Sequence, residues 1–153
     1  MIQRIQTVYI VLAVAFTIAC LCLQIGTFDN DGLVVGREYN LWLIDGMGAY
    51  SLVTWPMFAV LLLSAALGIY TIFVYSNRKN QARLCVFNLL LLVGWYILYG
   101  VYSRVLAGGA LEQAGFVPSV PAAFPGLAFV FYILARRGIM ADERLVRAAD
   151  RIR

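Results

Sequence analysis

The chain has 153 residues, of which 63% are hydrophobic and 13% charged, and its net charge is +4 at pH 7. Soluble domains average about 45–50% apolar and about 25% charged residues, and a soluble domain of this size could not bury the excess apolar surface. The chain contains no histidine, which excludes haem ligation by imidazole, His-containing zinc sites and Ser-His or Cys-His nucleophile pairs. The composition therefore indicates a membrane protein.

Four apolar runs have the length of about 20 residues that a helix needs to cross a membrane. The first run follows Arg4, but it is longer than the core of a signal peptide and no A-x-A cleavage site follows it, so we predict a retained anchor. In chain order the predicted spans cover about 5–28, 51–75, 84–106 and 116–135.

The fourth run begins among Pro118, Pro121 and Pro125. Proline inside a helix removes a backbone hydrogen bond and clashes with the preceding turn. We therefore expect Pro125 to kink or break this span unless a neighbour satisfies the freed carbonyl group.

Residues 29–50 form a long connection between the first two spans. "DNDG" is a turn signal, and "LVV" and "YNLWLI" are β-prone stretches separated by "GRE". We predict a structured outer loop, either a small β-hairpin or a packed lid. The next connection, "SNRKNQAR", is a short polar turn, which predicts that the second and third helices are antiparallel neighbours.

The distribution of charge predicts the orientation in the membrane. If both termini are cytoplasmic, ten of the twelve Lys and Arg residues fall on the cytoplasmic side, and only Arg37 and Arg104 fall outside. Cytoplasmic loops of membrane proteins are enriched in Lys and Arg. We therefore predict a multi-pass protein of the bacterial cytoplasmic (inner) membrane with cytoplasmic N- and C-termini.

The predicted spans contain few polar side chains. Gln24 and Asn88 are the most polar of them, and each is predicted to make an interhelical hydrogen bond of roughly 0.6–2 kcal/mol, with the lining of a polar cavity as the alternative. Trp95, Tyr99 and Tyr102 share one helical face. They are interpreted as an interfacial aromatic belt, or as a wall against the outer loop or a quinone-like ligand.

The sequence offers no constellation of catalytic residues. It contains no nucleophile elbow, phosphate-binding loop or cluster of metal ligands, and the three cysteines are interpreted as small apolar helix residues. We therefore expect no enzymatic activity, no bound metal and no cofactor.

Residues 141–153 are predicted to form an amphipathic cytoplasmic helix, separated from the fourth span by a hinge at Gly138. Asp142 and Glu143 occupy its first turn, where the helix dipole favours negative charge. The helix is expected to lie on lipid headgroups, to dock on a cytoplasmic partner or to fold back on the "SNRKNQAR" turn, whereas nucleic acid is not an expected ligand. The residues predicted to contact the membrane surface or a partner are Arg136, Arg137, Arg144, Arg147 and Arg151.

The two ends of the chain, "MIQRIQTVYI" and "DERLVRAADRIR", resemble those of a family of small four-span inner-membrane proteins from Bacteroidetes-type bacteria. The family is defined by a domain of unknown function. The resemblance covers the whole chain and implies the four-span architecture, but it implies no activity, ligand or catalytic residue.

The expected fold is an all-α membrane protein: one domain, 1–153, with four antiparallel transmembrane helices, a structured outer loop and a cytoplasmic tail helix. The expected function is that of a non-enzymatic accessory or scaffold protein. Its expected partners are the lipid bilayer and an unidentified membrane or cytoplasmic protein, which it engages through the tail and the outer loop. The alternative is a small transporter or a protein that handles lipids or other hydrophobic ligands, using Gln24, Asn88 and Tyr99.

Overall fold

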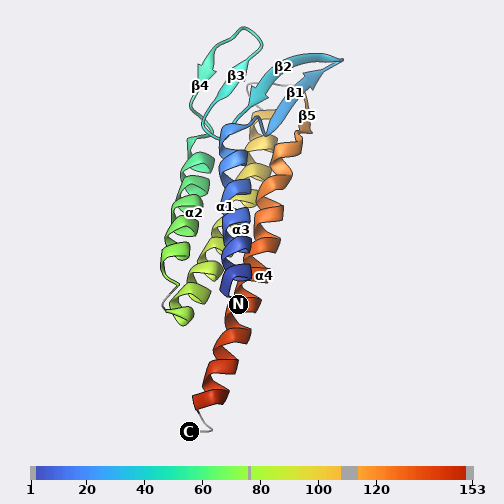
Figure 1. Ribbon diagram of the computed structural model, residues 1–153. Coiled ribbons are helices and arrows are strands. Elements are labelled where there is room, and N and C mark those ends of the chain that lie inside the picture. Colours follow the sequence, from blue (N-terminus) through green and yellow to red (C-terminus); the bar gives the residue numbers. More distant parts are fainter. Residues whose placement is uncertain (1–2, 76, 108–113, 151–153) are drawn as a thin grey trace.

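Four long helices form the body of the protein (Figure 1). The computed structural model describes residues 3–75, 77–107 and 114–150. All four helices are long and apolar enough to cross a membrane, and each packs mainly against two neighbours, in the ring order α1, α2, α3, α4. The helices are α1 (Gln3–Cys22), α2 (Trp55–Phe73), α3 (Arg78–Ala107) and α4 (Phe124–Asp150).

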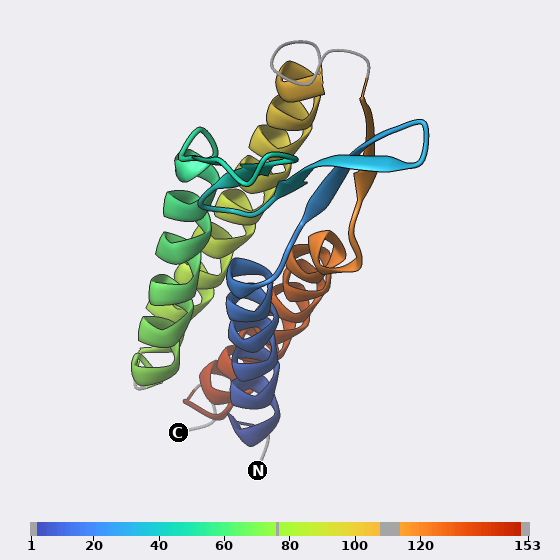
Figure 2. The same ribbon diagram turned by 90° about the horizontal axis from the view of Figure 1, so that it is seen from above.

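A five-stranded antiparallel sheet covers one end of the helices, here called the sheet end (Figures 1 and 2). The other end, where α1 begins and α4 ends, is called the terminal end. The strand order is β4-β3-β2-β1-β5, so the first strand lies between the second and the last. The strands are β1 (Gly26–Asn30), β2 (Leu33–Glu38), β3 (Leu43–Asp45), β4 (Tyr50–Ser51) and β5 (Gly115–Pro118).

This sheet shows that the expected all-α fold is wrong. The first apolar run leaves the helix at Cys22, and its last residues form β1. The start of the fourth run forms β5, which pairs with β1 over the Cα partners from Gly26 and Pro118 to Asp29 and Gly115. Residues at one end of each of these two predicted spans are therefore strands, because a short apolar segment next to a helix is as apolar as the helix itself.

The predicted "DNDG" turn connects β1 to β2. Asn30 pairs with Leu33, which leaves Asp31 and Gly32 as a two-residue loop. Their φ angles are +51° and +85°, and a type I′ hairpin turn requires positive φ at both central positions, which Asp-Gly readily adopts. The local sequence therefore determined this hairpin, although not the three strands added to it.

The fourth helix is continuous where a hinge was expected. Gly138 lies inside α4, which runs to Asp150, so residues 141–150 extend the fourth span and do not form a separate helix. A Cβ atom at Gly138 would lie 2.9 Å from Cγ of Gln6, so this glycine allows α1 to approach α4. Pro125 is the second residue of α4, in the first turn, where proline is tolerated.

The main core fills the space between the helices and contains the fully buried Trp95 and Tyr132. Gly68 of α2 is part of this packing, because a Cβ atom there would lie 2.6 Å from Cγ2 of Val14 and would also collide with the hydroxyl group of Tyr132. The absence of a side chain at this position lets α1, α2 and α4 pack closely together.

We expect the Gly68→Ala substitution to lower the free energy of unfolding by about 1–3 kcal/mol, because an extra methyl group in a well-packed core forces its neighbours to move. Gly100→Ala is the matched control, since a Cβ atom at this helical glycine meets nothing within 4 Å. Thermal unfolding in detergent measures both effects. Equal unfolding midpoints for the two variants would contradict the close packing of α2 against α1 and α4.

Candidate functional site

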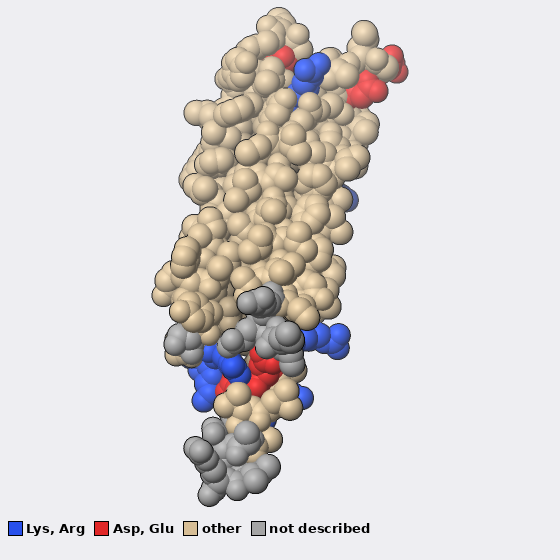
Figure 3. Space-filling model, in the orientation of Figure 1, with Lys and Arg blue, Asp and Glu red and all other residues tan. Residues whose placement is uncertain are grey.

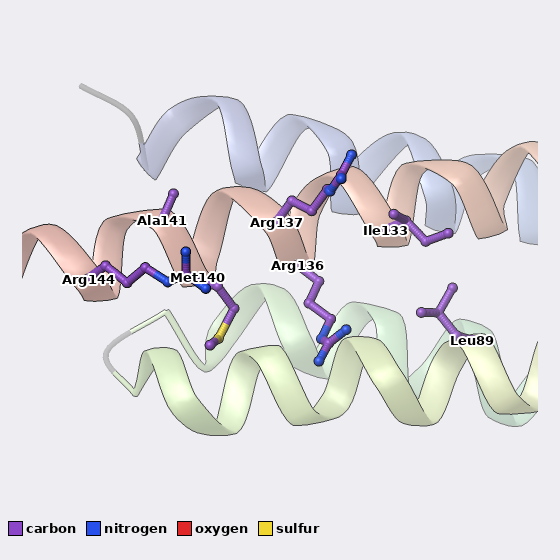
Figure 4. Close-up of a pocket in the computed structure, with 7 residues that line it drawn as sticks. All are labelled: Leu89, Ile133, Arg136, Arg137, Met140, Ala141 and Arg144. Carbon is purple, nitrogen blue, oxygen red and sulfur yellow. The ribbon is translucent and has the colours of Figure 1, made fainter.

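A pocket of about 530 Å³ lies between α3 and α4 near the terminal end (Figure 4). Leu89 of α3 and Ile133 of α4 face each other at its apolar end, and Arg136 points toward α3. Arg144 extends along α4 toward Met140. We call this the arginine pocket, and its lining residues are Leu89, Ile133, Arg136, Arg137, Met140, Ala141 and Arg144.

The periodicity of α4 explains this arrangement. Residues four apart lie on one face of a helix, so Arg136, Met140 and Arg144 follow each other along α4. All three arginine side chains of the pocket are exposed. Among the described residues that line the pocket none is acidic, so three positive charges gather there without a carboxylate.

The acidic residues of this part of α4 have partners elsewhere. The Nε2 group of the buried Gln6 donates a 2.9 Å hydrogen bond to Oδ2 of Asp142, and Arg78 donates to the carbonyl oxygen of Asp142 at 3.3 Å. Nζ of Lys79 lies 3.9 Å from Oε1 of Glu143. Arg78 and Lys79 belong to the predicted polar turn "SNRKNQAR", most of which forms the first turns of α3. This segment contacts α4 at Asp142 and Glu143.

A second polar site lies beneath the sheet, in the otherwise apolar interior. Nε1 of Trp95 donates a 2.8 Å hydrogen bond to Oδ1 of Asn40, and Nδ2 of Asn40 donates a 2.7 Å bond to the carbonyl oxygen of Cys20. Asn40 and Trp95 are fully buried. The ring of Trp95 stacks on Tyr99 at 5.1 Å, and the hydroxyl group of Tyr99 donates to the carbonyl oxygen of Ile25 at 2.9 Å.

Glu38, at the end of β2, is the fully buried acidic residue of this second site. Neither of its carboxyl oxygens has a hydrogen-bond partner among the described residues. A Cβ atom on the paired Gly26 would lie 3.3 Å from Oε2 and would collide with Phe116, so glycine leaves the room that this carboxyl group occupies. Desolvation by burial raises the pKa of Glu38 from 4.5 to about 7, and the site therefore favours the neutral acid.

The polar residues predicted in the spans differ in their positions. Asn88 accepts a 2.9 Å hydrogen bond from Ser64 across the interface of α2 and α3. Gln24 follows the end of α1 and donates at 3.3 Å to the carbonyl oxygen of Gly26, two residues along the chain, so it does not connect helices. Gln24, Asn88 and Tyr99 are held by different partners, which does not support a shared transport path.

Of the five arginines predicted to contact a partner or the membrane surface, Arg136, Arg137 and Arg144 line the arginine pocket. The side chain of Arg147, and the whole of Arg151, lie outside the described residues.

Sequence reasoning missed the buried roles of Glu38 and Asn40. Gly36, Glu38 and Asn40 are buried, and they alternate with the exposed Arg37 and the half-buried Tyr39. Their spacing of two residues, which is that of one face of a strand, was the signal available in the sequence.

The family described as "Domain of unknown function (DUF4293)" matches residues 2–152. The chain belongs to this family. The match covers nearly all of the sequence, as the resemblance of the two ends implied, and a domain of unknown function assigns no role to either site. Among the curated proteins, none matches the chain.

Proposed function

We propose that this member of the DUF4293 family is an integral protein of the inner membrane of a Bacteroidetes-type bacterium, with four spans and cytoplasmic termini. We further propose that it is a non-enzymatic accessory or scaffold protein that engages partners at both ends. The observation that carries the proposal is an apolar four-helix bundle with an ordered, partly apolar and exposed surface at each end.

The surface of the helices supports the membrane assignment. On the face shown in Figure 3, charged residues gather toward the two ends, and the wide middle carries other residues. Large apolar side chains are exposed along all four helices, as a lipid environment favours. Examples from the four helices are Val11, Leu62, Leu63, Leu90, Val93 and Val130.

The two ends support the scaffold role. At the sheet end, Leu33 and Met47 are exposed at the turns of the two outer hairpins, and Met47 is 96% accessible. At the terminal end, α4 extends beyond the other helices (Figure 1) and exposes Leu145 and Val146. Exposed apolar groups on ordered elements outside the predicted hydrocarbon layer are typical of protein contact surfaces.

We expect a membrane-impermeant maleimide to label a Met47→Cys variant in intact cells, and to label Arg144→Cys only after the cytoplasmic membrane is opened. The positive-inside rule gives this direction. Both variants are made in a Cys22→Ser background, since Cys22 is exposed whereas Cys20 and Cys85 are buried. Labelling of the Arg144→Cys variant alone in intact cells would invert the proposed orientation.

Crosslinking in native membranes followed by purification tests the scaffold role. Removal of residues 145–153 keeps Asp142 and Glu143 together with their partners Gln6, Arg78 and Lys79, and deletes the exposed apolar groups of the tail. We expect this form to lose at least one crosslinked partner that a Met47→Ser variant keeps. Identical sets of partners for the intact and shortened forms would contradict a role for the tail.

A second candidate function is the binding of a lipid or other apolar ligand. The arginine pocket favours it, because three arginines line a pocket that also has an apolar surface, at one end of the bundle. This candidate needs no transport path through the bundle.

A further inference from the structure

We propose that the arginine pocket binds the phosphate group of an anionic phospholipid, with Arg136 and Arg144 as the principal contacts. The inference rests on the proposed membrane location, and it assigns a site and a ligand class to the lipid-binding candidate. It follows from the charge of the pocket, its apolar end and its place along the helices.

The charge of the pocket calls for an anion. Arg136, Arg137 and Arg144 lie within one pocket, and no described side chain forms a salt bridge with any of them. Like charges that line one pocket repel each other, and a bound anion would reduce that repulsion. The planar guanidinium group donates two parallel hydrogen bonds to phosphate oxygens, which makes arginine a common phosphate ligand.

The size and lining of the pocket indicate a lipid. A volume of about 530 Å³ is within the range of small-molecule sites, about 300–1,000 Å³, and is larger than a phosphate ion needs. Leu89 and Ile133 form its apolar end. Beyond them, exposed Leu90 and Val130 continue the apolar surface of α3 and α4, along which an acyl chain can lie.

The place of the pocket fits the depth of a headgroup. Going along α4 from the sheet end, Arg136 is the first charged residue after twelve uncharged ones that begin at Phe124. The phosphate of a phospholipid lies at the same boundary between hydrocarbon and water. Basic pockets between spans on the cytoplasmic side are known to hold anionic lipid headgroups.

A smaller adjoining pocket is the weaker candidate. Its volume is about 220 Å³ and it shares Arg136 and Met140 with the arginine pocket. It also contains Glu143, which lies close to Lys79. Arg83 also lines it, but the smaller volume and the carboxylate disfavour a lipid phosphate there. The lipid phosphate is therefore assigned to the arginine pocket.

The test uses the full-length protein in neutral detergent and native mass spectrometry to measure lipid binding. We expect phosphatidylglycerol to bind about tenfold more tightly than phosphatidylcholine of the same acyl chains, since each basic residue favours anionic lipid. We expect the Arg136→Gln/Arg144→Gln double variant to lose this preference. The matched control is Arg37→Gln/Arg104→Gln, which removes two exposed arginines at the sheet end and is expected to keep the preference.

Equal binding of the two lipids, or an unchanged preference in the double variant, would overturn the proposal. Thermal unfolding with each ligand supplies a third test: an equal rise of the unfolding midpoint with inorganic phosphate and with phosphatidylglycerol would also overturn it. The last would assign the pocket to free phosphate.

If the double glutamine variant does not fold, the Arg136→Lys/Arg144→Lys variant is used in its place. It keeps the positive charge but lacks the planar guanidinium group, and its preference for phosphatidylglycerol is expected to fall about threefold. An unchanged preference in this variant also contradicts the proposal. The maleimide labelling tests the membrane orientation separately, so the two failures are distinguishable.

Discussion

Replacing Asn40 with alanine is expected to lower the free energy of unfolding by about 2–5 kcal/mol. The substitution leaves the indole N–H of Trp95 and the carbonyl oxygen of Cys20 without their partners, and each unsatisfied buried group costs about 1–3 kcal/mol. It also detaches the segment between β2 and β3 from α1 and α3. Chemical or thermal unfolding of the purified protein in detergent measures the loss.

The control is Asn80→Ala, which removes an exposed asparagine near the start of α3 and is expected to change stability by less than about 0.5 kcal/mol. Trp95→Phe separates the hydrogen bond from packing, because it keeps an aromatic ring and removes the donor. In the double variant with Asn40→Ala the loss should be smaller than the sum of the single losses, since the two side chains share one bond. Additive losses would show that the Asn40–Trp95 bond does not couple the sheet to α3.

The stability of the protein is expected to fall as the pH rises from about 4.5 to about 7 because of Glu38. Burial raises the pKa of this carboxyl group from 4.5 to about 7, so between these values the folded chain holds a proton that the unfolded chain has released. Unfolding then becomes easier with increasing pH, by about 1.4 kcal/mol per pH unit and roughly 3 kcal/mol in total. Above about pH 7 this contribution is constant.

The Glu38→Gln variant cannot titrate, so its stability relative to the native sequence should increase by roughly 3 kcal/mol between pH 4 and pH 8. Any constant cost of burying the amide group is the same at both pH values and cancels. Asp31→Asn, in the exposed turn between β1 and β2, controls for the loss of one carboxyl group from the same sheet. Parallel stability curves for native and Glu38→Gln protein would show that Glu38 is not held as a neutral acid.

The helices could be predicted from the sequence because a helix able to cross a membrane needs a long apolar run, and such runs are visible without any knowledge of packing. Helix α2 lies inside its predicted span, whereas α3 begins at Arg78, six residues before its predicted span and inside the predicted polar turn. The turn at Asp31 and Gly32 could be predicted for a similar reason, since its positive φ angles depend on local residue type.

The sheet could not be predicted as a whole. The pairing of β1 with β5 joins Gly26 to Pro118, which are more than ninety residues apart, and no local pattern records such a pairing. Both strands continue an apolar run that also forms a helix. A short apolar segment beside a helix is ambiguous between the two structures, and tertiary packing decides between them.

The two candidate sites differ in the same way. The arginines of α4 could be recognised from their number and spacing, although only the packing of α3 against α4 shows that three of them share a pocket with Leu89 and Ile133. The sequence placed Glu38 in the "GRE" separator and Asn40 in the β-prone stretch "YNLWLI", both in the predicted outer loop. Their burial depends on contacts with Trp95 and Gly26, which no reading of residues 29–50 alone could provide.

By itself the sequence determined the four apolar helices, the distribution of charge between the two ends and the turn of the first hairpin. These properties follow from composition and local conformation, which act on neighbouring residues. Only the tertiary structure decided that α4 continues through Gly138, that five strands cover one end and that an acid is buried beneath them. Each of these depends on which surfaces meet, because burial and close approach are properties of pairs of segments that are distant in the chain.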